Sequence, residues 1–166
     1  MVSVADKPVT HRIARAEAVV TMSSEAFRLV RRNRLGKGDV LAIARIAGIQ
    51  AAKETSRLIP LCHPIPLDDV DVKLALVHAK RAVHIEVRAS TRAATGVEME
   101  AMTGAAVAAL TVYDMCKGVD RSAAIAPVRL LAKSGGLSGS WQRPTRGQKA
   151  AAPKRAPRPA RSGRRR

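Results

Sequence analysis

Aromatic residues are almost absent from this sequence of 166 residues, which contains one Phe, one Trp and one Tyr. Non-specific binding of single-stranded nucleic acid depends on bases stacking on aromatic side chains, so this composition argues against that function. Apolar residues still make up 46% of the chain, and Ala, Val, Leu and Ile must therefore fill the core. A chain of this length supports one domain.

Cysteine is also rare, and long apolar runs are missing. Cys62 and Cys116 form no paired motif, which is typical of a reducing compartment rather than of a disulfide framework. No run of about 18 apolar residues predicts a membrane span. The first ten residues carry Asp6 and Lys7 where a signal peptide has an apolar segment. We therefore expect a cytoplasmic protein.

Acidic residues are few: 13 Asp and Glu stand against 30 Lys and Arg, a net charge of +17. Ten of the Lys and Arg residues lie in residues 143–166. The rest of the chain has 20 Lys and Arg and 13 Asp and Glu, a net charge of +7. We expect a catalytic domain over residues 1–140 and a basic tail over residues 141–166. The tail is rich in Pro, Ala, Lys and Arg without periodicity and is predicted to be disordered, with no indicated partner.

Hydrophobic periodicity predicts four strands and three helices. The strands are expected at Val9–Thr21, Val70–Val77, Val83–Ala89 and Ala124–Leu131. The helices are expected at Glu25–Arg34 after Ser23, at Val40–Leu58 after an Asp39 N-cap, and at Thr95–Val119. This order predicts an α+β fold, a ferredoxin-like antiparallel sheet with helices packed on one face.

The last of these helices is the main candidate for chemistry. It is apolar on several faces, yet Glu98 and Glu100 lie in its first turn and Asp114 and Lys117 near its end. We expect Thr95 to cap it. Ionisable groups on a buried helix are costly unless they are paired or used.

Each of these groups has two interpretations. Asp114 and Lys117 share a helix face and form either a solvated ion pair or, if partial burial moves their pKa values, an acid–base pair. Glu98 and Glu100 point apart, so they are not a ready carboxylate dyad and suit the positive end of the helix dipole. His63 is held among prolines and is either a structural histidine or a catalytic one.

Two lysines lie beside glycines. Lys37 in GKGD and Lys133 in KSGGLSG suit contact with a phosphate group, although neither stretch is a Walker motif. Cys62 and His63 are adjacent and have no second cluster at zinc spacing, so we expect no metal site.

The length of the helix constrains the site. Glu100 and Asp114 are 14 residues apart, which on a continuous helix corresponds to roughly 21 Å. Either they serve different sites, or one site joins the helix ends of two subunits. The second option predicts an oligomer.

The segments around these residues carry a specific resemblance. KGDVLAIARIAGIQAAKETSRLIPLCHPIPL, TGVEMEAMTGAAVAALTVYDMCKGVD and PVRLLAKSGG resemble the cyclic pyranopterin monophosphate synthases of molybdenum cofactor biosynthesis, from about Val4 to Gly139. The resemblance implies a lyase that rearranges a 3′,8-cyclised dihydroguanosine triphosphate to cyclic pyranopterin monophosphate and releases pyrophosphate. It also implies a homohexamer, a trimer of dimers, with interfacial active sites and no cofactor.

The same resemblance assigns roles to individual residues. Asp114 and Lys117 match the central acid–base pair. The residues that match substrate-binding positions are Leu61, Cys62, His63, Glu98, Met99, Glu100, Lys37 and Lys133. The chain departs from the family at Leu137 and Ala94, where lysine is usual, and both changes remove positive charge from segments expected near the triphosphate. These departures leave open a non-catalytic relative, although every expected proton-transfer residue is present.

A second hypothesis is a ferredoxin-like nucleic-acid-binding module that uses the basic tail for phosphate contact. The lack of aromatic residues in the expected strands weighs against base stacking. A narrower version, in which the tail associates with RNA, an acidic partner or a membrane surface while the domain does catalysis, also remains open.

Overall fold

The computed structural model describes residues 1–144. The strands are β1 (Thr10–Thr21), β2 (Asp69–Val77), β3 (Ala82–Ala93), β4 (Ala124–Ser134) and β5 (Trp141–Gln142). The helices are α1 (Ser24–Arg31), α2 (Val40–Lys53), α3 (Thr55–Leu58) and α4 (Glu98–Cys116), with a 3₁₀ turn at His78–Lys80. These elements follow the predicted order, with α3 and β5 in addition.

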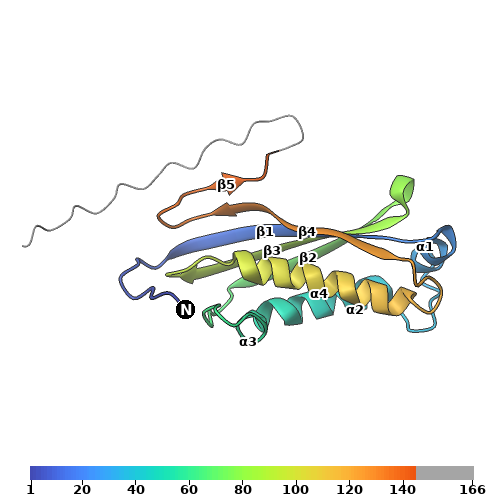
Figure 1. The fold of residues 1–166 in the computed structure, drawn as a ribbon, viewed down its shortest axis with the longest axis horizontal. Coiled ribbons are helices and arrows are strands. Elements are labelled where there is room, and N and C mark those ends of the chain that lie inside the picture. Colours follow the sequence, from blue (N-terminus) through green and yellow to red (C-terminus); the bar gives the residue numbers. More distant parts are fainter. Residues whose placement is uncertain (145–166) are drawn as a thin grey trace, which may run out of the picture.

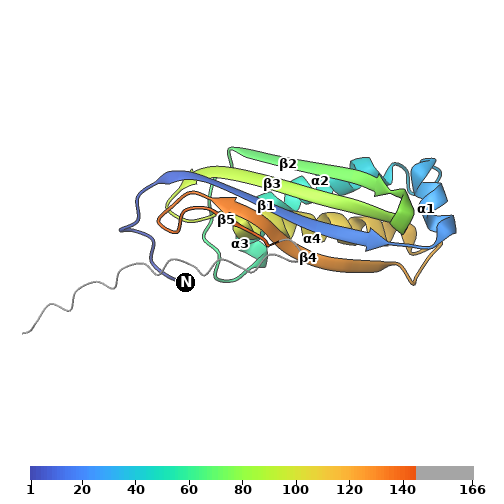
Figure 2. The same ribbon diagram turned by 90° about the horizontal axis from the view of Figure 1, so that it is seen from above.

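The strands form one antiparallel sheet in the order β2-β3-β1-β4-β5. Figures 1 and 2 show α2 and α4 lying side by side on one face of this sheet, while no helix from residues 1–144 covers the other face. With β1 between β3 and β4, the first four strands have the ferredoxin-like arrangement. The predicted α+β fold is confirmed.

Strand alternation determines which face of the sheet is buried. Val83, Ile85 and Val87 are fully buried beneath the helices, whereas His84 and Glu86 point to the open face and are partly exposed. This alternation in β3 is the pattern of a sheet covered on one side only. β1 pairs with the whole of β3, from Thr10 opposite Ala93 to Thr21 opposite Ala82.

The first two helices begin where the sequence predicts. The Ser23 side chain accepts a hydrogen bond from the Ala26 amide, and the Asp39 side chain accepts one from the Ala42 amide. Each satisfies one of the free N–H groups in a first helical turn.

The predicted helix Val40–Leu58 is interrupted in the structure. α2 ends at Lys53, and the separate turn α3 follows from Thr55. Thr55 is buried, and its hydroxyl donates to the carbonyls of Ala51 and Ala52 at the end of α2. Hydroxyl groups that bond to carbonyls one turn back compete with the helical hydrogen bonds, which accounts for the break.

Two glycines allow α2 and α4 to pack closely. A Cβ atom at Gly104 would lie 3.0 Å from the Gly48 carbonyl oxygen, and one at Gly48 would lie 3.1 Å from the Gly104 carbonyl oxygen. A larger residue at either position would separate the two helices, because interiors are close-packed.

The end of the described chain corrects one prediction. The disordered tail was expected from Trp141, but Trp141 and Gln142 form β5 and pair with Lys133 and Ala132 of β4. Residues 145–166, the remainder of the predicted tail, lie outside the described residues. Within residues 1–144, no helix has both the length and the apolar character required to cross a membrane.

Candidate active site

α4 is shorter than predicted but uninterrupted, and polar side chains lie at its two ends. It runs from Glu98 to Cys116 with Val97 as its N-cap, so the predicted capping role of Thr95 is wrong. Thr95 instead lines a pocket beside the first turn. Because the helix is continuous, Glu100 and Asp114 remain about 21 Å apart along its axis.

Three charged side chains meet at the C-terminal end of α4, and we call Lys37, Asp114 and Lys117 the lysine cluster. The Lys37 ammonium lies 2.6 Å from one carboxylate oxygen of Asp114, and the Lys117 ammonium lies 2.7 Å from the other. Lys37 also donates to the main-chain carbonyl of Asp114. The cluster borders a cavity of about 440 Å³.

Ion pairing, rather than the expected partial burial, controls the protonation of this cluster. The side chains of Asp114 and Lys117 are 51% and 52% exposed. Hydrogen bonds from Lys117 and then Lys37 lower the pKa of Asp114 to about 2. The hydrogen bond to Asp114 in turn raises the pKa of Lys117. At neutral pH Asp114 is therefore a carboxylate and Lys117 an ammonium group.

A second group of side chains lies at the N-terminal end of α4, and we call it the glutamate pocket. Its cavity measures about 220 Å³. Two chain segments form its walls, and among the lining residues are Leu61, Cys62, His63, Glu98, Met99 and Glu100. These are six of the residues that the sequence analysis assigned to the substrate.

The two glutamates of this pocket have different environments. Glu100 is 4% exposed, and its Oε2 atom has no hydrogen-bond partner within the described chain. Burial raises the pKa of Glu100 to about 7, against the effect of a backbone hydrogen bond. Glu98 instead accepts a hydrogen bond from the Lys133 ammonium at 2.8 Å. The charge of Glu98 adds to the effect of burial on the pKa of Glu100.

Cys62 lies close enough to Glu100 for the charge of that carboxyl group to affect its thiol. Burial and the charge of Glu100 raise the pKa of the Cys62 thiol, so the thiol is protonated at neutral pH. Cys62 and Cys116 are both free cysteines. Residues 1–144 contain no group of three or more His, Cys, Asp or Glu side chains placed to hold a metal ion.

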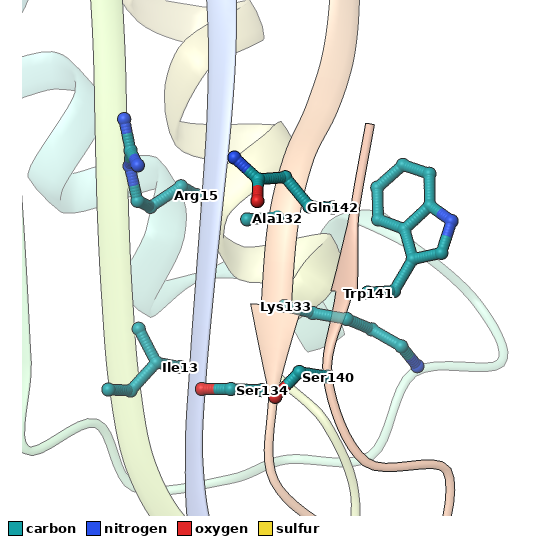
Figure 3. Close-up of a pocket in the computed structure, with 8 residues that line it drawn as sticks. All are labelled: Ile13, Arg15, Ala132, Lys133, Ser134, Ser140, Trp141 and Gln142. Carbon is teal, nitrogen blue, oxygen red and sulfur yellow. The ribbon is translucent and has the colours of Figure 1, made fainter. Parts of the chain in front are cut away.

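Lys133 connects the sheet to the glutamate pocket. It also borders a cavity of about 350 Å³ formed with β1 and β5. Figure 3 shows its side chain directed away from Arg15 and Ile13, past the β5 strand that carries Trp141. Lys133 therefore borders that cavity and, through its ion pair with Glu98, also contacts the glutamate pocket.

Arg12 is a cation near this pocket that the sequence analysis did not single out. Its guanidinium donates to the Ala94 carbonyl at 3.3 Å, and its buried Nε atom has no partner within residues 1–144. It also packs against Gly136, where any Cβ atom would clash with it. Arg12 therefore supplies positive charge beside Ala94, one of the two positions where the sequence analysis expects a lysine, and against Gly136. Only the fold brings these segments together, and no local motif marks Arg12.

Two further residues near the lysine cluster also escaped the sequence analysis. Tyr113 and Arg121 line the same cavity, and the Tyr113 hydroxyl donates to the Arg121 carbonyl. The signal that could have identified them in the sequence is their proximity to Asp114. The strands β1 to β4 contain no Phe, Tyr or Trp, so these four strands offer no platform for stacked bases, and the aromatic residue of the described sheet is Trp141 on β5.

The fold and the two polar clusters define a class: a ferredoxin-like α+β protein with cationic and acidic groups at both ends of one buried helix. The sequence model of the MoaC family matches residues 1–136. The chain belongs to the MoaC family.

Named relatives agree with this assignment. A cyclic pyranopterin monophosphate synthase from Thermomicrobium roseum is 54% identical over 143 residues, which cover 86% of each protein. Molybdenum cofactor biosynthesis protein 1 of Homo sapiens is 51% identical over 86% of this chain but only 22% of its own length, and the Mus musculus protein is 52% identical with the same coverage. A de novo designed protein with a ferredoxin fold, solved by NMR, aligns with a TM-score of 0.39 and 14% identity over 82% of this chain and 97% of its own. The fold assignment therefore rests on strand order.

Proposed function

We propose that the protein is a cyclic pyranopterin monophosphate synthase, a lyase of molybdenum cofactor biosynthesis. It converts a 3′,8-cyclised dihydroguanosine triphosphate to cyclic pyranopterin monophosphate and releases pyrophosphate. The family assignment and the printed name of the T. roseum relative support this reaction. The observation that carries the proposal is the grouping of every predicted site residue at one of the two ends of α4.

We assign proton transfer to the lysine cluster. The Lys117 ammonium is a proton donor in direct contact with the Asp114 carboxylate, and Lys37 supplies a second positive charge. Because Asp114 holds both ammonium groups, it orients them toward the shared cavity. A substrate anion that draws either lysine away frees the carboxylate to accept a proton.

We assign the glutamate pocket to the substrate and to additional proton transfers. A carboxyl group with a pKa of about 7 is suited to exchange protons at neutral pH, which is the property of Glu100 here. His63 and Cys62 line the same cavity. Formation of the cyclic phosphate breaks the bond between the α- and β-phosphates, and the leaving pyrophosphate requires positive charge. Lys133 and Arg12 are the cations on this side.

We propose that one complete site needs both clusters, contributed by different protomers of a homo-oligomer. The separation of about 21 Å along α4 supports this, because one nucleotide cannot place its reacting atoms at both ends of the same helix. The helix layer also exposes apolar side chains that suit a protein contact: Ile46 is 66% exposed on α2 and Leu110 is 55% exposed on α4. A homohexamer built as a trimer of dimers is the assembly we expect, and the two free thiols suit the cytoplasm.

Incubation of the purified protein with the cyclised triphosphate tests the reaction directly, with pyrophosphate and pterin as the measured products. Lys117→Ala and Asp114→Ala should each abolish pterin formation while the circular dichroism spectrum and the oligomer size stay unchanged. Lys73→Ala, which removes an exposed pair with Asp71 on β2, is the matched control and should retain full activity. Wild-type turnover in either cluster variant would disprove its assigned role.

A further inference from the structure

The two walls of the glutamate pocket come from separate parts of the chain. One wall is the proline-rich segment that carries Cys62 and His63, and the other is the turn from Thr95 into α4. The first wall leads into β2, which begins at Asp69, and the second follows the end of β3 at Ala93. The distance between the two walls therefore depends on the hydrogen bonds that join these segments just beyond the paired residues of β2 and β3.

Prolines limit the hydrogen bonds that the first wall can make. Pro60, Pro64 and Pro66 have no N–H group, so this segment offers few donors to the neighbouring strand. Its carbonyl oxygens can still accept hydrogen bonds, and that of Pro66 accepts one from a side chain on β3.

Thr91 is that donor. It is fully buried on the helix-facing side of β3, and its hydroxyl donates a short hydrogen bond to the Pro66 carbonyl. One other hydrogen bond joins these two segments outside the ladder in the described chain, from the Asp68 amide to the Ser90 carbonyl. Of the two, the Thr91 bond lies nearer to Cys62 and His63 in sequence.

We propose that Thr91 is a positioning residue that holds the Cys62-His63 wall against the N-terminal end of α4. Without its hydroxyl, the Pro66 carbonyl turns away and the wall moves outward from Glu100. The hydrogen bond thus determines the width of the pocket in which His63 and Glu100 face the substrate. The catalytic part of this inference rests on the proposed function, whereas the geometric part does not.

The test compares Thr91→Val, which keeps the shape but loses the hydroxyl, with Thr91→Ser, which keeps the hydroxyl. The first readout is the rate at which a small thiol reagent labels the protein, located by mass spectrometry of peptides. Cys62 is partly exposed and lines the pocket, whereas Cys116 is fully buried and serves as an internal control for the integrity of the core. This readout needs no catalytic activity, so it remains informative if the proposed reaction is wrong.

In Thr91→Val, we expect faster labelling of Cys62 and unchanged slow labelling of Cys116. Burial and Glu100 raise the pKa of the Cys62 thiol, and an opened wall relieves both effects. Below the pKa, labelling accelerates about tenfold for each pH unit by which the pKa falls, because the thiolate is the reactive form. Thr91→Ser should label like the wild type. Thr21→Val removes a comparable hydroxyl-to-carbonyl bond at the far end of β1 and should also leave Cys62 unchanged.

The second readout is turnover. Thr91→Val should lower kcat by about tenfold to a hundredfold with little change in KM, because a shift of about 1 Å in a reacting group has an effect of this size. The Thr91 hydroxyl bonds to neither Lys133 nor Arg12, the proposed phosphate-binding cations, so KM should stay near the wild-type value. Thr91→Ser should restore kcat.

The results separate positioning from general stability. Faster labelling of Cys62 alone, reversed by serine, supports the proposal. Unchanged labelling in Thr91→Val, a serine variant that behaves like valine, or labelling of Cys116 together with Cys62 would each overturn it. The last outcome would show that Thr91 maintains the core rather than the pocket.

Discussion

Replacement of Glu100 by glutamine should stabilise the protein at alkaline pH and not at acidic pH. In the folded protein, burial raises the pKa of this carboxyl from 4.5 to about 7. Between these values the unfolded chain releases a proton that the folded chain retains. The contribution of Glu100 to stability is therefore fully present below pH 4.5 and declines as the pH rises, until it is lost above about pH 7.

The size of this change in stability follows from the difference between the two pKa values of Glu100. From 4.5 to about 7, at 1.36 kcal/mol per pH unit, the loss in the free energy of unfolding amounts to about 3 kcal/mol. A glutamine side chain has nearly the same shape as glutamate and never ionises, so Glu100→Gln should regain up to about 3 kcal/mol at pH 8. For a protein of this size, that corresponds to an increase of roughly 6 to 12 °C in the unfolding midpoint.

Thermal unfolding between pH 4.5 and pH 8 measures this directly, at fixed protein concentration and ionic strength because an oligomer's stability depends on both. Glu98→Gln is the control: it breaks an ion pair with Lys133 that contributes at most about 1 kcal/mol, and it removes only the smaller repulsion that Glu98 exerts on Glu100, so it should not reproduce the stabilisation at alkaline pH. The reasoning fails if Glu100→Gln is equally stabilising at every pH, or destabilising at pH 8. Lower turnover in the stabilised variant would indicate that Glu100 is retained for function.

Two further predictions concern packing and assembly. Gly104→Val should destabilise the protein by about 1–3 kcal/mol in urea unfolding, because the added side chain meets the Gly48 carbonyl, while Gly118→Ala, which points into open space, should have little effect. Asp114→Ala and Glu100→Gln, each with little activity alone, should regain about a quarter of wild-type activity when co-expressed in equal amounts, because a quarter of randomly assembled interfaces combine two intact halves. A mixture no more active than its components would mean that each site belongs to one protomer.

Much of this fold could be predicted because local signals agree with the tertiary structure. The alternation of Val83, Ile85 and Val87 with polar residues predicts β3 and its buried face, and Ser23 and Asp39 mark two helix starts. One failure occurred where a long-range contact determines the structure. β5 exists because Trp141 and Gln142 pair with β4, and a strand of two residues has no periodicity that would predict it.

The candidate site could also be predicted in part, namely where local spacing in the sequence brings its residues together. The Asp114–Lys117 pair follows from helix spacing alone. The addition of Lys37 to that pair depends on a loop before α2 reaching the end of α4, which no local pattern indicates. Arg12 was missed for the same cause, since its neighbours at Ala94 and Gly136 are distant in sequence.

The composition of α4 explains why the site is divided. The middle of the helix packs against both α2 and the sheet, and Gly104, Ala105, Ala108 and Ala109 are buried there. Such positions leave no room for a lysine or a carboxylate, and an ionised group placed there would lose its hydration without a partner. Charged groups are therefore confined to the two ends of the helix, where Glu98 reaches Lys133 and Asp114 reaches Lys37. Glu98 and Asp114 are 16 residues apart on this helix, roughly 24 Å at 1.5 Å per residue, and this separation is why the proposed site, which uses both ends, calls for a second protomer.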